Sequence, residues 1–110
     1  MPVHDTNDAE LRTLIFDFRR VVVKFTKPDC NVCAHMAHIF SHLSNISQFE
    51  NILFLRMDAK ENPVSSKEVS LSGTPFFATY LNGTLNQCSL VSEKQTLIEM
   101  LSALQMAETN

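Results

Sequence analysis

The N-terminal quarter of the chain contains two apolar segments with different spacing. In the first, apolar residues recur at helical spacing, at Leu11, Leu14, Ile15 and Phe18. With Asp5 or Asn7 as its cap, this pattern predicts a helix that ends at about Phe18. Residues 21–26 are dense in β-branched and aromatic side chains up to the break at Pro28, which indicates a central strand.

A long amphipathic helix is predicted from about Asn31. Its apolar side consists of Val32, Met36, Ile39, Phe40, Leu43 and Ile46, and its polar side of His35, His38, Ser41, His42 and Asn45. Residues 52–58 then have the composition of a second buried strand. Asn62 as cap and Pro63 at the first helical position predict a short helix that ends near Leu71.

The C-terminal third contains the clearest turn signal of the chain. Asn82 and Gly83 tolerate positive φ and separate residues 76–81 from residues 84–90, so we predict a hairpin with a two-residue turn. Strand alternation should bury some of its aromatic side chains, which are Phe76, Phe77 and Tyr80. Ser92 and Gln95 have the spacing of a capping box and predict a closing helix to about Met106.

The order of these elements determines the fold class. Strands separated by helices need crossover connections and a sheet that is covered on both faces, and the hairpin adds an antiparallel edge. We therefore expect an α/β fold in which a central mixed β-sheet is flanked by helices on both faces. Residues 1–110 should form one domain, with a frayed tail from about residue 107.

Composition and charge narrow the possible partners. Nine basic and twelve acidic residues give a net charge of -3, and the absence of a basic run argues against nucleic-acid binding. No apolar run is long enough to cross a membrane, and residues 1–5 lack the pattern of a signal peptide, so we expect a cytoplasmic protein without a membrane partner. In a reducing compartment, a close cysteine pair is more often catalytic or metal-binding than structural.

Cys30 and Cys33 stand where the central strand meets the long helix. The unpaired amides and the positive dipole end of a helix N-terminus stabilise a thiolate relative to a thiol. We therefore predict that Cys30 is a nucleophile. Cys33, one turn further along, is within range of a disulfide but more shielded, which suits the cysteine that resolves a mixed disulfide.

Taken together, four motifs resemble the thioredoxin family, over about residues 7 to 106. They are Val21–Phe25, Cys30-x-x-Cys33, Gly73-Thr74-Pro75 and Asn82-Gly83. The resemblance implies a thioredoxin-like fold and thiol-disulfide oxidoreductase activity. It also implies that Pro75 is cis and faces the dithiol, and that the backbone of Thr74 pairs with the substrate in a groove next to Gly73.

The same resemblance implies the partners of the reaction. The substrates would be protein disulfides, reduced in the cytoplasm, and the electron donor would be a flavoprotein similar to thioredoxin reductase that draws on NADPH. The Cys30–Cys33 disulfide would itself be the redox group. No other cofactor and no metal are expected.

Residues next to the dithiol depart from the family pattern. Residues 29–33 are Asp-Cys-Asn-Val-Cys, where thioredoxins usually have Trp-Cys-Gly-Pro-Cys, and the chain contains no tryptophan. By like-charge repulsion, Asp29 opposes a thiolate at Cys30, whereas Lys27 and the helix terminus favour it.

Lys24 occupies the strand position at which thioredoxins carry a buried acid. A lysine there can extend its amine to water, pair with a carboxylate, or be kept neutral by burial and act as a base toward Cys33. We hypothesise that Lys24 tunes Cys33. The alternative is a strand lysine whose amine lies in solvent.

Two other functions remain open for the cysteine pair. The altered residues around the dithiol would suit a redox-inactive binding module that docks a protein partner. Cys30, Cys33, His35 and His38 could also form a zinc or iron–sulfur ligand set. Against the metal site, His35 stands about 200° around the helix from Cys33.

The third cysteine, Cys88, lies in the second strand of the predicted hairpin. A lone strand cysteine is usually a small buried hydrophobic residue, and we expect this here. A regulatory or intermolecular disulfide is the alternative that an odd number of cysteines permits.

Overall fold

A five-stranded sheet forms the centre of the protein in a computed structural model that describes residues 2–107. Residues 108–110, most of the predicted frayed tail, lie outside this range. The strands are β1 (His4–Asp5), β2 (Arg20–Thr26), β3 (Leu53–Asp58), β4 (Phe76–Leu81) and β5 (Thr84–Leu90). The helices are α1 (Asp8–Asp17), α2 (Asn31–Ser44), α3 (Pro63–Glu68) and α4 (Lys94–Met106), with a 3-10 turn at Ser47–Phe49.

The sheet has the mixed character that the sequence predicted. Its strand order is β1-β3-β2-β4-β5, with β2 at the centre. β3 runs parallel to both β1 and β2, whereas β4 runs antiparallel to β2 and to β5. The predicted α/β fold with a central mixed sheet is therefore confirmed, and the hairpin forms one edge of it.

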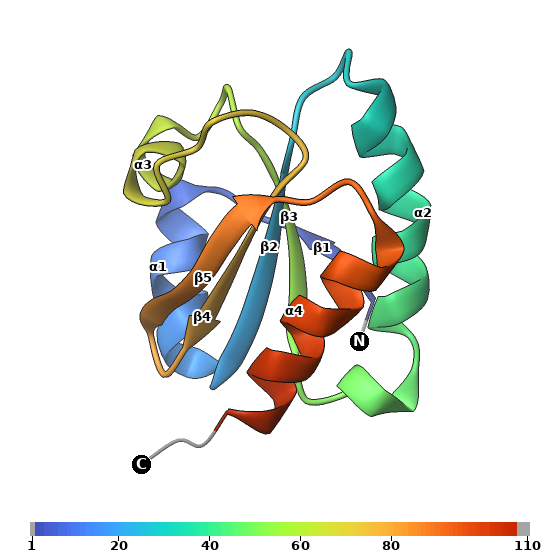
Figure 1. The fold of residues 1–110 in the computed structure, drawn as a ribbon. Coiled ribbons are helices and arrows are strands. Elements are labelled where there is room, and N and C mark those ends of the chain that lie inside the picture. Colours follow the sequence, from blue (N-terminus) through green and yellow to red (C-terminus); the bar gives the residue numbers. More distant parts are fainter. Residues whose placement is uncertain (1, 108–110) are drawn as a thin grey trace.

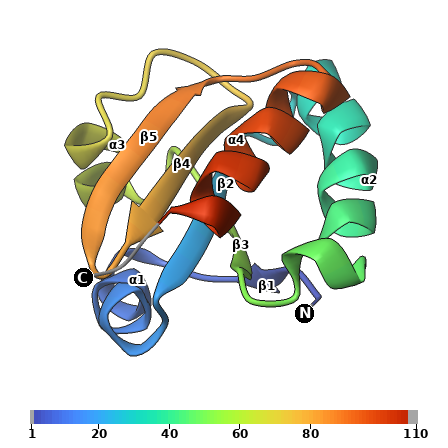
Figure 2. The same ribbon diagram turned by 60° about the horizontal axis from the view of Figure 1, so that its bottom comes forward.

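Helices cover both faces of the sheet, with α1 and α3 on one face and α2 and α4 on the other (Figures 1 and 2). Side chains of β2 alternate between the two layers. Val21, Val23 and Phe25 belong to the core beneath α1, and Val22 to the core beneath α2 and α4. The same alternation places Lys24 on the α2 face, where an apolar side chain would be expected.

Local sequence explains where the first helix begins and how the hairpin turns. The side chain of Asn7, rather than Asp5, caps α1 by accepting a hydrogen bond from the Glu10 amide at 2.9 Å. Asn82 and Gly83 have φ values of 54° and 81°, the left-handed conformations that a two-residue hairpin turn requires. Both features were predicted.

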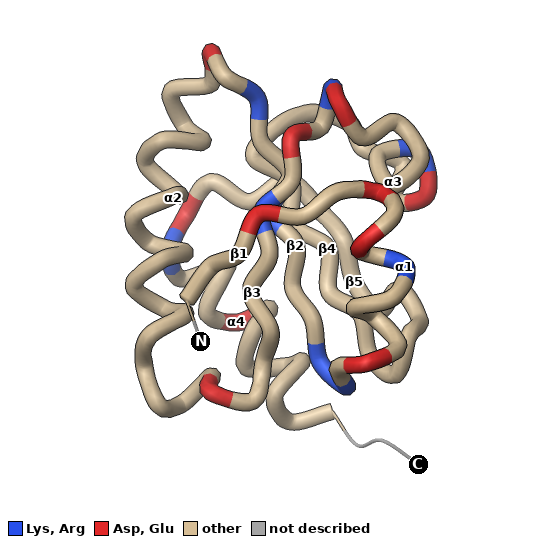
Figure 3. The backbone as a smooth tube through the Cα atoms, turned by 180° about the vertical axis from the view of Figure 1, so that it is seen from behind, with Lys and Arg blue, Asp and Glu red and all other residues tan. Residues whose placement is uncertain are grey.

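The predicted aromatic core of the hairpin is confirmed. Phe76, Phe77 and Tyr80 are all buried, and they lie on both faces of the sheet. Basic and acidic positions are interspersed along the backbone rather than separated into two faces (Figure 3). Within residues 2–107, no helix combines the length and the apolar character needed to span a membrane.

Two helix boundaries and one strand differ from the sequence prediction. The predicted capping box of Ser92 and Gln95 is wrong, because the N-cap of α4 is Glu93 in an extended conformation, one residue later, and it makes no side-chain cap. α3 ends at Glu68 rather than near Leu71, and Ser70 has a positive φ of 53° that ends the helical path. β1 was not predicted at all.

Candidate dithiol site

Cys30 and Cys33 form a disulfide at the start of α2, where the sequence placed them. Their Cα atoms are 5.1 Å apart. Cys30 is the N-cap residue and is partly exposed, whereas Cys33 is 3% exposed. The two sulfur positions therefore differ in access, with Cys30 on the solvent side.

A backbone amide in the first turn of α2 points to the sulfur of Cys30. The amide of Cys33 donates a hydrogen bond to Cys30 Sγ at 3.1 Å, so this sulfur occupies the place of a capping oxygen. An amide donor and the positive end of the helix dipole favour an anion at this position after the disulfide is reduced. The first turn of α2 contains no acidic residue that would oppose this effect.

Lys27 and Asp29, the two charged residues of the loop before α2, are both exposed. Water screens exposed charges, so neither residue has the strong influence on the dithiol that a buried charge would have. Their predicted opposing effects on Cys30 stay predictions.

Lys24 is the charged residue most closely associated with the dithiol. Its side chain is 2% exposed, and Nζ donates a hydrogen bond to the carbonyl oxygen of Cys33 at 3.0 Å. Burial, followed by repulsion from Arg56, lowers the pKa of Lys24 from 10.5 to about 8. Among residues 2–107, Arg56 forms an ion pair with Asp5, and no carboxylate pairs with Lys24. The alternatives of a solvent-exposed amine and a carboxylate pair are therefore wrong.

A pocket of about 280 Å³ opens beside the dithiol on this side of the sheet. It is lined by Lys24, Thr26, Lys27, Pro28, Cys30, Cys33, Ala34, Ala37, Arg56 and Asp58. The carboxylate of Asp58 accepts hydrogen bonds from the amides of Lys60 and Glu61, at 2.9 and 3.0 Å. Asp58 therefore lines the pocket while its Oδ1 is engaged by its own loop.

The loop of Gly73, Thr74 and Pro75 lies at the same end of the sheet as the dithiol. Phe76, which follows it directly, pairs with Phe25 in the sheet, so the loop adjoins the segment that leads from β2 to Cys30. Gly73 and Thr74 are partly exposed, and the Thr74–Pro75 peptide bond is cis. The roles that the resemblance implies for these residues in substrate docking stay predictions.

The residues that suggested a metal site do not come together as one. His35 and His38 are exposed on α2, whereas Cys33 is buried on its inner side. Within the described part of the chain, no group of three or more His, Cys, Asp or Glu residues could hold a metal ion.

The expectation that Cys88 is buried is wrong. Cys88 is exposed, as is every residue of β5, and its thiol donates to the carbonyl oxygen of Val69 at 3.5 Å. β5 is the last strand of the sheet, and its residues are exposed on both faces. Strand alternation alone cannot reveal this, because it assumes that one face of the strand is covered.

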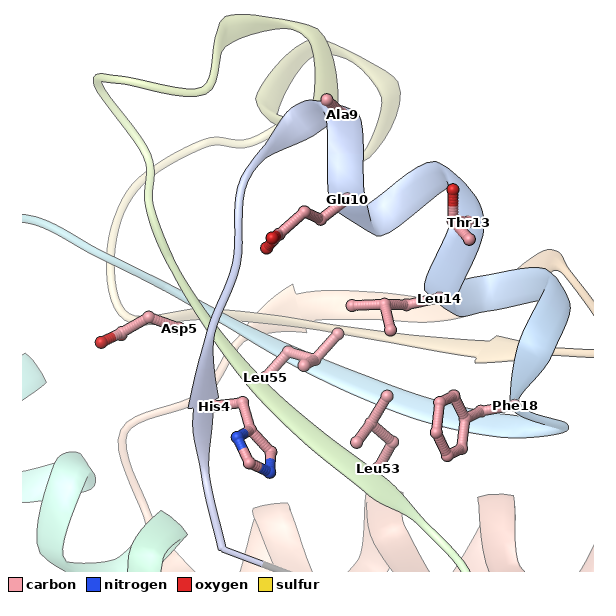
Figure 4. Close-up of a pocket in the computed structure, with 9 residues that line it drawn as sticks. All are labelled: His4, Asp5, Ala9, Glu10, Thr13, Leu14, Phe18, Leu53 and Leu55. Carbon is pink, nitrogen blue, oxygen red and sulfur yellow. The ribbon is translucent and has the colours of Figure 1, made fainter.

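A larger hollow of about 640 Å³ lies between β1, β3 and α1 (Figure 4). The side chains of Leu14, Phe18, Leu53 and Leu55 give it an apolar lining. It belongs to the α1 side of the sheet and contains no sulfur, so it is separate from the dithiol site. The sequence did not indicate it because β1, which forms one of its walls, was not predicted.

The thioredoxin fold consists of such a sheet between helices, with a dithiol where the central strand meets a long helix, and this protein is therefore a dithiol protein of thioredoxin fold. The family model described as Thioredoxin matches residues 2–103. The chain belongs to the thioredoxin family.

Individual proteins are similar to parts of this chain. The chain is 33% identical over 63 residues to a thioredoxin of Ictalurus punctatus, a match covering 57% of this chain and 59% of the relative. It is 32% identical over 75 residues to monothiol glutaredoxin-S17 of Arabidopsis thaliana, covering 68% of this chain and 15% of the relative. The chain thus spans less than two thirds of the length of either protein. The structure of a Malassezia sympodialis thioredoxin has a TM-score of 0.87 at 18% identity, covering 96% of this chain and 95% of that one, which shows the shared fold.

Proposed function

We propose that this protein is a thiol-disulfide oxidoreductase that reduces disulfides in other proteins. The observation that carries the proposal is the unequal placement of the two sulfurs. Cys30 is partly exposed, and its sulfur accepts a hydrogen bond from the Cys33 amide at the start of α2. Cys33, which is disulfide-bonded to Cys30, is buried. This is the arrangement that a nucleophile and a resolving thiol need, and membership of the thioredoxin family supports it.

The reaction would proceed by two successive exchanges. The thiolate of Cys30 attacks a substrate disulfide, forms a mixed disulfide and releases the first substrate sulfur as a thiolate. The thiolate of Cys33 then attacks Cys30 Sγ, which forms the Cys30–Cys33 disulfide and releases the second substrate sulfur. Two electrons have then passed from the dithiol to the substrate. The loop of Gly73, Thr74 and Pro75 would hold the substrate backbone during both steps.

The oxidised protein would be returned to the dithiol by a flavoprotein similar to thioredoxin reductase, with NADPH as the source of electrons. We place the protein in the cytoplasm, where glutathione and thioredoxin systems keep exposed dithiols reduced. The reactive disulfide would be its only redox group.

A trapping experiment tests the division of roles. In an insulin-reduction assay with dithiothreitol, the wild-type protein should accelerate precipitation, and Cys30→Ser should abolish the acceleration. In a separate incubation without dithiothreitol, reduced Cys33→Ser should accumulate a mixed disulfide with a protein substrate, because the resolving sulfur is missing. Cys88→Ser is the matched control and should behave as the wild type.

Equal residual activity in Cys30→Ser and Cys33→Ser would contradict the assigned roles. A wild-type protein that does not accelerate precipitation would instead favour a docking module without turnover. One observation favours this second function. Residues 29–33 are Asp-Cys-Asn-Val-Cys, where thioredoxins usually have Trp-Cys-Gly-Pro-Cys.

A further inference from the structure

The amine of Lys24 is buried at the centre of the sheet, and no carboxylate among residues 2–107 pairs with it. Lys24 lies opposite Arg56 of β3 and Phe77 of β4 in the strand pairing, so its neighbours in the sheet are a second cation and an aromatic ring. Its amine donates a hydrogen bond to the carbonyl oxygen of Cys33. A buried ammonium that lacks a counterion is unfavourable, and such groups occur mainly where their charge has a use.

The other charged groups around this pocket do not neutralise Lys24. Arg56 is directed to Asp5, with which it makes hydrogen bonds of 2.7 and 3.0 Å. Asp58 accepts from the amides of its own loop, and Lys27 adds a further positive charge at the mouth of the pocket. Asp58 also lines this pocket, but among residues 2–107 neither it nor any other carboxylate lies within ion-pair distance of Lys24. The groups that become anions here when the disulfide is reduced are the two cysteine sulfurs.

We propose that Lys24 is a positioning residue for the resolving thiol: its ammonium, held against the carbonyl of Cys33, favours the thiolate of Cys33 and so promotes release of the substrate. This inference rests on the proposed function and describes how the same site is regulated. An opposite charge within a few ångströms lowers the pKa of an acid because it stabilises the anion.

The proton and electron balance of the resolving step can be followed atom by atom. In the mixed disulfide, the Cys33 thiol gives its proton to solvent, and the ammonium of Lys24 stabilises the thiolate that remains. The Cys33 sulfur then bonds to Cys30 Sγ, and the substrate sulfur leaves with the electron pair of the broken bond. With a pKa of about 8, Lys24 is mainly an ammonium at pH 7, so the charge that stabilises the thiolate is present.

The same charge also affects the redox equilibrium. A cation that stabilises a thiolate stabilises the reduced dithiol relative to the disulfide, and this raises the reduction potential. A carboxylate at this position would act in the opposite direction. Lys24 therefore speeds substrate release while it makes the dithiol a weaker reductant.

The titration of Cys33 tests this directly. In a Cys30→Ser, Cys88→Ser background, Cys33 is the only thiol, and its ionisation can be followed by thiolate absorbance at 240 nm as a function of pH. We expect Lys24→Met to raise the pKa of Cys33 by about one to three units. Lys24→Gln, which keeps a hydrogen-bond donor without the charge, should do the same. Lys24→Arg should restore a pKa close to that of the background protein.

The matched control is Lys60→Met, which removes one positive charge from an exposed side chain and should leave the titration unchanged. A pKa of Cys33 that moves no further in Lys24→Met than in Lys60→Met would overturn the proposal. A shift in Lys24→Met that is absent in Lys24→Gln would overturn it too, because the hydrogen bond rather than the charge would then be responsible.

A second measurement extends the test to the redox pair. Equilibration of the Cys88→Ser protein in glutathione buffers should give a lower reduction potential for Lys24→Met than for Lys24, and an equal or higher value would contradict the proposal. Neither measurement requires turnover. If the protein is inactive but Lys24→Met changes the Cys33 pKa and the reduction potential as expected, only the proposed function is refuted. If the protein is active but Lys24→Met changes neither, only this inference is refuted.

Discussion

Replacing Lys24 with methionine should remove a rise in stability that the protein otherwise gains at alkaline pH. In the folded protein, burial and the nearby Arg56 lower the pKa of Lys24 to about 8, whereas an unfolded lysine titrates near 10.5. Between pH 8 and 10.5 the unfolded chain therefore binds more protons at this residue than the folded chain does. Stability must then rise with pH across this window.

The size of the effect follows from the two pKa values. The difference corresponds to about 3 kcal/mol, of which about 2.5 kcal/mol develops between pH 7 and 10. Lys24→Met also removes the hydrogen bond to Cys33 and changes the packing, but these contributions shift the two stability curves by a constant amount. The pKa of Tyr80, raised to about 12 chiefly by burial, causes a loss of stability from about pH 10 upward that is the same in both proteins.

Urea unfolding of the oxidised proteins, followed by far-UV circular dichroism at pH 7, 8, 9 and 10, measures the difference. In the oxidised form the dithiol does not titrate. The free energy of unfolding of the wild type should rise relative to Lys24→Met by about 2.5 kcal/mol over this range. The free energy of unfolding of Lys60→Met should change with pH in the same way as that of the wild type. If the curves of wild type and Lys24→Met stay parallel to within about 0.5 kcal/mol, the buried ammonium has been misassigned.

Three further substitutions test local features of the fold by urea unfolding at pH 7. Gly83→Ala should destabilise the protein by about 1–2 kcal/mol, because φ is +81° and the new Cβ would lie 2.9 Å from the Phe16 ring; an unchanged midpoint would contradict this. Asn7→Ala should cost about 1 kcal/mol through loss of the α1 cap, whereas Asn7→Ser should retain most of the stability. Asp5→Asn should change stability by less than about 1 kcal/mol, since its ion pair with Arg56 is exposed, and a larger loss would show that β1 depends on this pair.

Elements that carry their own periodicity or turn residues were predictable from the sequence. The hairpin at Phe76–Leu81 and Thr84–Leu90 matches its prediction, because Asn82 and Gly83 specify the turn without help from distant residues. The start of α2 at Asn31 was also predictable, which placed both cysteines correctly. The two-residue strand β1 was not, because it exists only through pairing with Leu55 and Arg56 of β3.

The environment of single side chains was less accessible to sequence reasoning. Whether Lys24 reaches water depends on how closely α2 covers β2, and the strand sequence contains no information about that distance. Alternation assigned Cys88 and its strand a covered face, although β5 is an edge strand and all of its residues are exposed. In both cases the outcome was decided by tertiary packing rather than by local pattern.

The exposure of Cys88 makes the protein convenient to label at one site. In the oxidised protein the other two sulfurs are bonded to each other, so a maleimide dye would react at β5. The chain contains no tryptophan, so its own ultraviolet emission would add little background. A dye on this outer strand would therefore offer a spectroscopic reporter of partner association that leaves the redox chemistry intact.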